Sequence, residues 1–186
     1  MIATATQYKI DTAHSSATFA VAHLGISKVK GEFADVQGSI QYDPADPAAS
    51  KLEAVIGVAT ISTRDEGRDT HLKSADFFDV EKFPTMTFVS TKVEPAGEDR
   101  LKVTGNLTIR DVTKQVVLDV EGPTGEIKDP WGVFRRAASA RTAISRKDFG
   151  MTWNSLLETG GLLVGDKVEI ALEVEVMAQT ESDTAN

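Results

Sequence analysis

Apolar and polar residues alternate along much of this chain, and this period of two constrains the fold more than any other feature. From Leu101 to Arg110 the odd positions are Leu, Val, Gly, Leu and Ile, whereas the even positions are Lys, Thr, Asn, Thr and Arg. Residues 167–176 alternate in the same way. Successive side chains of a strand point to opposite faces, so each run predicts a strand with one buried face.

Further strands are expected along the whole chain, separated by clusters of Gly, Asp and Pro. Their expected bounds are Gln7–Ile10, Ser16–His23, Ser27–Phe33, Val36–Tyr42, Lys51–Ile61, Thr85–Glu94 and Ala137–Arg146, and alternation also resumes over residues 116–120 after a short connection. Many short strands at hairpin spacing predict an all-β sandwich or barrel. We expect one domain over residues 1–186, with an ordered core of about residues 7–178.

One stretch, residues 63–79, breaks the alternation. Thr63 and Glu66 fit a capping box, and Asp69 could cap a second turn. His71, Ala75 and Phe78 then share one helical face. We expect two short helices that cover one end or side of the sheet structure.

Composition excludes several classes of function. The net charge of −8 repels phosphate backbones, so general nucleic-acid binding is not expected. The chain has no cysteine, which excludes disulfides and thiolate metal sites. No apolar run reaches 18 residues, so no membrane-spanning helix is expected. The first residues do not resemble a signal peptide, which predicts a cytoplasmic location.

The three histidines, His14, His23 and His71, raise the question of a metal or catalytic site. An extended chain would place His14 and His23 ~30 Å apart and on opposite faces, although a bend near Ser15 would relax both objections. No HxH, HExxH or Gly-x-Ser-x-Gly motif is present. We therefore predict no metal, cofactor or catalytic residue, and expect His14 and His23 to be hydrogen-bonded scaffold.

Two expected strands lack a clear polar face. Residues 16–23 carry no formal charge, and small residues occupy both faces of residues 137–143. Small inward residues in a barrel leave room for a guest, whereas a tightly packed core under a helix is the alternative. Arginine side chains could meet a polar or phosphate head group, or simply lie on the surface, at positions Arg64, Arg68, Arg135, Arg136, Arg141 and Arg146.

The chain resembles the YceI family of lipocalin-like, polyisoprenoid-binding bacterial proteins. Five blocks in order carry this resemblance: "DTAHSSATFAVAHLG", "VKGEF", "STRDEGRDTHLKSADFFDVEKFPTMTF", "VTGNLTIRDVTKQVVLDV" and "ISRKDFGM". They extend from about Tyr8 to Met177.

The resemblance implies an eight-stranded antiparallel lipocalin-like barrel with an apolar channel, which fits the alternation and the short helical insert. It implies non-catalytic binding of a long-chain isoprenoid, such as a polyprenyl pyrophosphate or a quinone tail, with a carrier, storage or sensing role. Members are often homodimers and often periplasmic. Binding of fatty-acid-type lipids, an isomerase or hydrolase acting inside the same barrel, and a protein–protein module are the alternatives. The residues that we expect to line the channel are Phe19, Val21, Phe88, Leu107, Ile144, Met151 and Trp153.

Overall fold

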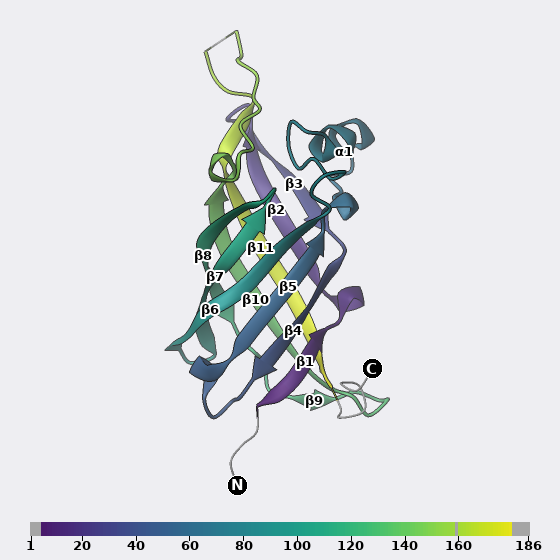
Figure 1. The fold of residues 1–186 in the computed structure, drawn as a ribbon, viewed down its shortest axis with the longest axis vertical. Coiled ribbons are helices and arrows are strands. Elements are labelled where there is room, and N and C mark those ends of the chain that lie inside the picture. The colour runs from purple at the N-terminus through teal and green to yellow at the C-terminus, as the bar shows by residue number, and fades with distance from the viewer. Residues whose placement is uncertain (1–4, 159, 180–186) are drawn as a thin grey trace.

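The strands close into a barrel in the computed structural model, which describes residues 5–158 and 160–179 (Figure 1). The strands are β1 (Thr6–Ile10), β2 (Ser16–His23), β3 (Ser27–Phe33), β4 (Val36–Tyr42), β5 (Lys51–Gly57), β6 (Thr85–Gly97), β7 (Arg100–Ile109), β8 (Val112–Glu121), β9 (Ile127–Lys128), β10 (Phe134–Ser145) and β11 (Val164–Ala178). One α-helix, α1 (Glu66–Lys73), and four short 3-10 helices, η1 (Thr12–His14), η2 (Pro47–Ala49), η3 (Val58–Thr60) and η4 (Arg146–Phe149), complete the described elements. The expected all-β class is confirmed.

Eight strands form the closed ring. The order β1-β4-β5-β6-β7-β8-β10-β11 returns to β1, and the pairings of this ring are antiparallel. The hairpin of β2 and β3 joins the ring through β11, and β9 pairs with β10. Closure removes free strand edges from the ring, which stabilises an antiparallel sheet of this size. Positions 1–4, 159 and 180–186 lie outside the described residues, so the expected core of about residues 7–178 falls almost entirely within them.

Strand β11 is long enough to pair with two strands in succession. Its 15 residues contact β2 near one end and β1 near the other. Between β1 and β2 the chain turns through η1, where the Asp11 carboxylate accepts a hydrogen bond from the Ala13 amide. The two ends of the barrel are called here the α1 end, near the β2–β3 turn, and the β9 end, near Tyr8.

The helical insert differs from the expectation. A single α-helix forms, and its N-cap is Asp65, whose carboxylate accepts a hydrogen bond from the Arg68 amide. The predicted cap, Thr63, is buried, and both its amide and its hydroxyl donate to Asp69. That bond prevents Thr63 from capping the helix and Asp69 from capping a second one. The helix ends at Lys73, so Ala75 is exposed instead of sharing a face with His71.

The expected strand Lys51–Ile61 is too long. Strand β5 ends at Gly57, where η3 begins. The Thr60 hydroxyl donates to the Gly57 carbonyl at 2.6 Å and accepts from the Ala34 and Asp35 amides. These local bonds replace the strand ladder. Strands β2, β3 and β4 have the expected bounds, whereas β9 was not foreseen.

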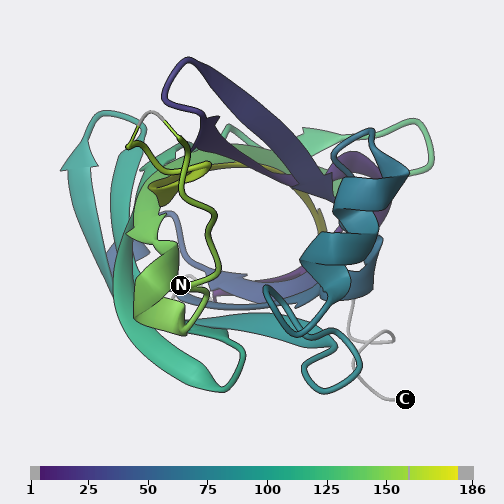
Figure 2. The ribbon, with the colours of Figure 1, turned by 90° about the horizontal axis from the view of Figure 1, so that it is seen from above.

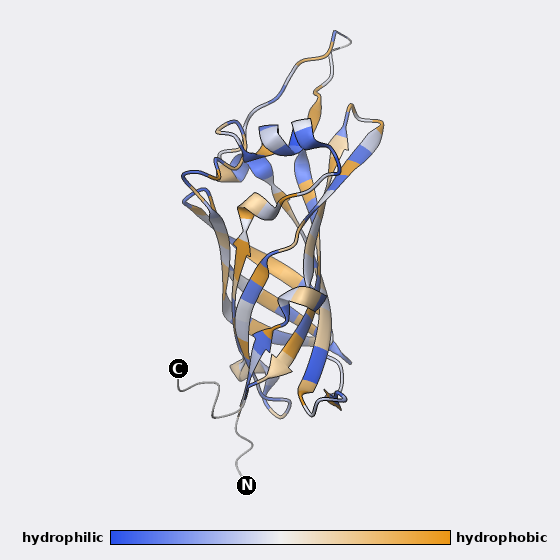
Figure 3. Cartoon of the chain, turned by 90° about the vertical axis from the view of Figure 1, so that its right-hand side faces the viewer, coloured by the Kyte–Doolittle hydropathy of each residue, from blue (hydrophilic) through white to orange (hydrophobic). Residues whose placement is uncertain are grey.

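The buried side chains lie inside the barrel. Hydrophobic and hydrophilic residues alternate along the strands (Figure 3), and the buried residues form two clusters that include Tyr8, Phe33 and Phe149 in one and Phe88 and Val103 in the other. In the described part of the chain, no helix has the length and apolar character needed to cross a membrane.

Candidate functional site: the barrel cavity

A cavity of about 420 Å³ runs inside the barrel and receives side chains from every strand of the closed ring. Its volume lies within the range of small-molecule pockets, roughly 300–1,000 Å³. The lining follows the period of two: from β11 it includes Val168, Ile170, Leu172, Val174 and Val176. The apolar face that each strand shows in the sequence is therefore the face that surrounds the cavity.

All seven side chains expected to line the channel do so. Phe19 and Val21 come from β2, Phe88 from β6, Leu107 from β7 and Ile144 from β10, and the segment after η4 adds Met151 and Trp153. Their contact with a ligand stays a prediction.

Two glycines let aromatic rings lie against the wall. The Phe19 ring occupies the space that a Cβ atom on Gly31 of the neighbouring strand would take, with Cε1 only 2.6 Å from that position. The Phe88 ring lies over Gly105 of β7 in the same way. Side-chain volume at either glycine would push the ring away from the wall.

Strand β10 contributes small residues to the wall. Ala138, Ala140 and Thr142 alternate inward and line the cavity. Their outward neighbours include Arg141 and Ala143, which are exposed. The small inward residues leave the centre of the barrel open, as predicted from the sequence.

The α1 end of the cavity is aromatic. Leu72, Phe77 and Phe78 line it, and the His71 ring packs edge-on against Trp153 with ring centroids 4.6 Å apart. Seen along the barrel, α1 lies at one side of the rim, and the segment after η4 lies opposite (Figure 2). Sequence reasoning placed the insert at one end or side but missed Leu72 and Phe77 as lining residues.

Arg146 fixes the segment that carries Trp153. Its side chain is 3% exposed and donates to the carbonyl oxygens of Gly165, Met151 and Trp153 at 2.7–2.8 Å. Burial lowers the pKa of this guanidinium, since the charged form loses hydration. Strand alternation could have found it, because Arg146 shares the inward parity of Ile144.

The β9 end carries a polar cluster. Tyr8 is 1% exposed, and its hydroxyl donates to Glu126 at 2.6 Å and accepts from Arg136 Nε at 2.9 Å. Arg136 also lies over the Tyr42 ring, at 5.5 Å from the centroid. Burial raises the pKa of Tyr8, and the bond to Glu126 raises it further.

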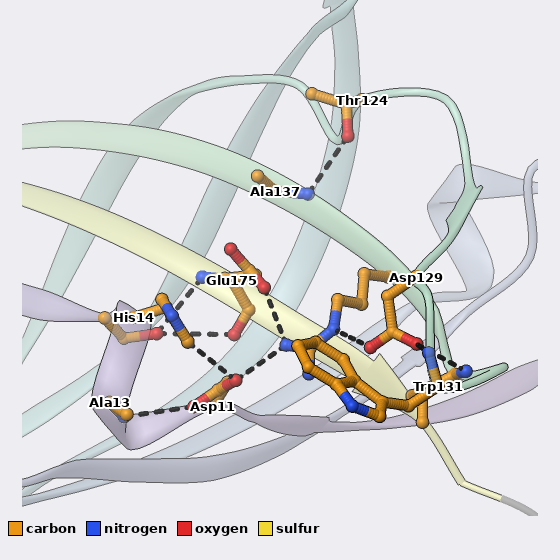
Figure 4. Close-up of polar contacts among 11 residues, drawn as sticks. Asp11, Ala13, His14, Thr124, Asp129, Trp131, Ala137 and Glu175 are labelled. Carbon is orange, nitrogen blue, oxygen red and sulfur yellow. Dashed lines mark hydrogen bonds and ion pairs between the residues drawn. The ribbon is translucent and has the colours of Figure 1, made fainter.

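The outer surface holds a second ionic cluster (Figure 4). Asp11, His14 and Glu175 place ligand atoms within 4.8 Å of one another, which is the spacing of a metal site. However, Arg135 Nη1 contacts both carboxylates at 2.7 Å, and its Nε contacts Asp129 at 2.7 Å. A guanidinium therefore already balances these carboxylates, and the cluster joins η1, β10 and β11. Sequence reasoning considered only histidines and missed this grouping.

The histidines take different positions. His14 Nδ1 lies 3.0 Å from Asp11, which confirms hydrogen bonding for this residue. His23 lines the cavity, and hydrogen bonding of its ring stays a prediction. His71 also lines the cavity, with Nε2 at 2.8 Å from Asp76. The Ser15 hydroxyl pairs with the Glu175 backbone instead of a histidine.

Comparison with known proteins agrees with this geometry. Residues 8–176 match the family described as "YceI-like domain". A UPF0312 protein of Shewanella baltica (strain OS185) is 41% identical over 153 residues, covering 81% of this chain and 80% of that protein. A UPF0312 protein of Azotobacter vinelandii is 42% identical over 151 residues, covering 80% of this chain and 78% of that protein.

Solved structures share the barrel. The Campylobacter jejuni YCEI protein superposes with a TM-score of 0.71 at 36% identity, covering 86% of this chain and 90% of that one. Burkholderia cenocepacia BcnA superposes with a TM-score of 0.76 at 24% identity, covering 89% of this chain and 98% of that one. A polyisoprenoid binding domain from Saccharophagus degradans superposes with a TM-score of 0.67 at 14% identity, covering 92% of this chain and 98% of that one. The last two likenesses concern the fold alone, and the expected eight-stranded antiparallel barrel is confirmed.

Proposed function

This chain belongs to the YceI-like family, and from that premise we propose that its barrel binds a long-chain isoprenoid lipid without catalysing a reaction on it. The observation that carries the proposal is the cavity itself, which is closed by eight strands and lined mainly by aliphatic and aromatic side chains. Each Å² of apolar tail surface that is removed from water contributes roughly 25 cal/mol to the free energy of binding. The structural likeness to a polyisoprenoid binding domain supports the same ligand class.

The wall chemistry favours binding over catalysis. His71 Nε2 is already paired with Asp76, and its ring packs between Phe77 and Trp153. General acid–base catalysis needs a group aimed at the reacting atom of a substrate. His23 is the remaining candidate for the alternative function, an isomerase or hydrolase acting on a hydrophobic substrate. Substitution of His23 by Gln would abolish turnover by such an enzyme but would leave lipid binding close to that of the wild-type protein.

Native mass spectrometry of the purified protein, followed by lipid extraction, tests the proposal. We expect a co-purified long-chain lipid, and saturable binding of an added polyprenyl lipid after its removal. A barrel that is reproducibly empty and shows no saturable binding would refute the function. A fatty acid as the sole co-purified lipid would favour the fatty-acid alternative. The same spectra report whether the chain is a homodimer, which stays a prediction.

Two variants of one strand provide a matched control. Ala138→Phe places a ring inside the cavity, because Ala138 lines it, whereas Ala143→Phe places the same ring on the exposed outer face of β10. We expect the first change to reduce the amount of bound lipid at saturation and the second to leave it unchanged. Equal lipid occupancy in both variants would mean that the lipid binds outside the barrel.

A further inference from the structure

Exposed large hydrophobic side chains gather at the α1 end of the barrel. They are Leu24, Ile26, Leu156 and Leu162, and among them Ile26 and Leu156 are 84% and 80% exposed. Single exposed apolar residues are common on proteins, but a group of them marks an interaction surface. These four residues are called here the apolar tips.

Two adjacent turns carry the apolar tips. Leu24 and Ile26 belong to the turn between β2 and β3, whereas Leu156 and Leu162 pair with each other in the segment between η4 and β11. The Leu24 amide donates to the Leu163 carbonyl at 2.9 Å, which joins the two turns. The segment between η4 and β11 projects beyond α1 at this end of the barrel (Figure 1). The tips therefore form one protruding apolar group.

The apolar tips lead directly into the cavity. His23 and Leu163, the chain neighbours of Leu24 and Leu162, line the cavity wall. Residues 16–27 carry no formal charge. An apolar surface therefore extends without interruption from the outside of the molecule to the inner wall, and a hydrophobic tail can follow it.

The charges near the tips do not favour an anionic partner. Glu158 is the only formally charged residue between Asp148 and Asp166, and it is exposed. Lys28, which follows the β2–β3 turn, is paired with Glu169 at 2.5 Å. Since the whole chain has a net charge of −8, the partner surface that fits this end is apolar or electrically neutral.

Leu24 occupies a backbone position that does not favour leucine. Its φ is 56°, and that of Gly25 is 71°, so both residues of the turn are left-handed. Asn-Gly is the preferred pair for two such residues, because Asn adopts a positive φ more readily than other side chains. A leucine here is strained and 37% exposed, so burial within the chain does not explain it.

The β9 end has exposed apolar residues of its own, but they do not continue into the cavity wall. Ile127 and Trp131 are 65% and 83% exposed. The chain neighbour of Ile127 is Glu126, which accepts a hydrogen bond from the Tyr8 hydroxyl. A polar group therefore lies between this exposed surface and the cavity, which makes the β9 end a matched control.

We propose that the α1 end docks on the surface of a neutral lipid bilayer, with the apolar tips in the interfacial region and the mouth of the cavity facing the lipid. This inference rests on the proposed function, because the bilayer is then the source or destination of the bound tail. A bilayer accepts protruding side chains without shape complementarity, whereas a stable protein interface needs roughly 800 Å² of fitted surface on each partner. The charged helix α1 lies at one side of the rim, where it can remain among head groups (Figure 2).

The chain has no cysteine, so a single label can be placed at either end. Ile26→Cys and Ile127→Cys, each carrying the environment-sensitive fluorophore NBD, are titrated with phosphatidylcholine vesicles. We expect the emission to rise and shift to the blue for the label at position 26 and to remain unchanged at position 127. Because apolar burial drives the docking, added salt should not weaken it, and added phosphatidylglycerol should not strengthen it.

Flotation with the same vesicles measures the partition of variants. Ile26→Ser and Leu156→Ser should each weaken it about tenfold, which is the effect of losing one buried aliphatic side chain, whereas Ile127→Ser should leave it within about twofold. Leu24→Asn should weaken it about threefold without lowering the melting temperature. A purely structural role of Leu24 would lower the melting temperature instead.

Several outcomes would overturn the docking proposal: no partition of the wild-type protein into vesicles, an equal response of both labels, or equal partition of all variants. Dissociation of a dimer in Ile26→Ser, with vesicle binding unchanged, would assign the tips to a contact between two copies of the chain. Native mass spectrometry separates this proposal from the proposed function. A lipid-filled barrel that does not bind vesicles overturns docking alone, whereas an empty barrel without saturable lipid binding overturns the proposed function even if the tips partition into vesicles.

Discussion

Adding a single methyl group at Gly31 tests whether the ring of Phe19 must lie against the wall. A Cβ atom at this position would lie 2.6 Å from Phe19 Cε1 and 2.9 Å from Thr63 Cγ2, closer than real Cβ contacts. Gly31→Ala must therefore move the Phe19 ring. Overpacking of this kind costs roughly 1–3 kcal/mol, whereas the reduced entropy of the unfolded chain returns about 0.4–1 kcal/mol. We expect a net loss of about 1–2 kcal/mol in the free energy of unfolding.

The second aromatic–glycine pair should respond more strongly. A Cβ atom on Gly105 would meet the Phe88 ring and, at 2.7 Å, the Val89 carbonyl oxygen. A ring can rotate, but a backbone carbonyl of the same sheet moves only with its strand. Gly105→Ala should therefore lower the free energy of unfolding by about 3 kcal/mol or more, which is a larger loss than that of Gly31→Ala. Gly125→Ala is the control, because nothing lies within 4 Å of its Cβ position, and it should change the stability by less than about 0.5 kcal/mol.

Urea unfolding of the single variants and of Phe19→Leu/Gly31→Ala measures these effects. If the Phe19 ring causes the loss, the double variant should show a favourable coupling of about 1 kcal/mol between the two sites. Lipid binding should weaken in Gly31→Ala relative to Gly125→Ala, because the displaced ring enters the cavity. Stability of Gly31→Ala equal to wild type, or strictly additive effects with Phe19→Leu, would refute the reasoning.

Three further predictions concern the ionic groups. The Arg135 guanidinium, aided by His14, holds the pKa of Asp11 at about 2, below its ordinary 3.8. Ionised Asp11 therefore contributes to the free energy of unfolding above pH 3.8, and this contribution is lost as the pH falls toward 2. Between pH 5 and 2, the free energy of unfolding should fall by about 1–2 kcal/mol more in the wild-type protein than in Asp11→Asn, as measured by urea unfolding. Burial raises the pKa of Tyr8 above 10.0. Neutral Tyr8 therefore contributes to stability below pH 10, and this contribution is lost as the pH rises through the folded-state pKa. Alkaline unfolding followed by circular dichroism would show the loss. Arg146→Met would leave three carbonyl oxygens without their donor and should cost about 3 kcal/mol or more, whereas an unchanged melting temperature would contradict the structural role of Arg146.

The strands and the lining residues could be predicted because one rule governs both. The period of two fixes which side chains point inward, and closure of the barrel turns that face into the cavity wall. This is why Phe88, Leu107 and Ile144 were placed correctly without knowledge of the strand order. The same rule also separates Arg136 and Arg146, which point inward, from Arg135 and Arg141, which point outward. That information was present in the sequence but was not used.

Other features depend on partners that lie outside the local pattern used to predict them. Thr63 looked like a helix cap because the capping rule considers only local positions, whereas its hydroxyl is bound to Asp69. The grouping of Asp11 with Glu175 and Arg135 spans the whole chain and arises only when β1 and β10 flank β11. Local patterns cannot reveal such contacts, because barrel closure brings these residues together.

The position of Arg146 combines the desolvation of a charge with hydrogen bonds that hold two chain segments together. A guanidinium in an apolar wall is stable only if its donors are satisfied, and the carbonyls of Gly165, Met151 and Trp153 satisfy most of them. No neutral side chain offers the same fork of N–H donors, so the three carbonyl oxygens explain an arginine at this position. Its charge is partly offset by the nearby Asp166 carboxylate, whose electrostatic attraction opposes the lowering of the Arg146 pKa that burial causes. Loss of the donors therefore lowers stability without a ligand, so the structural role of Arg146 can be measured separately from lipid binding.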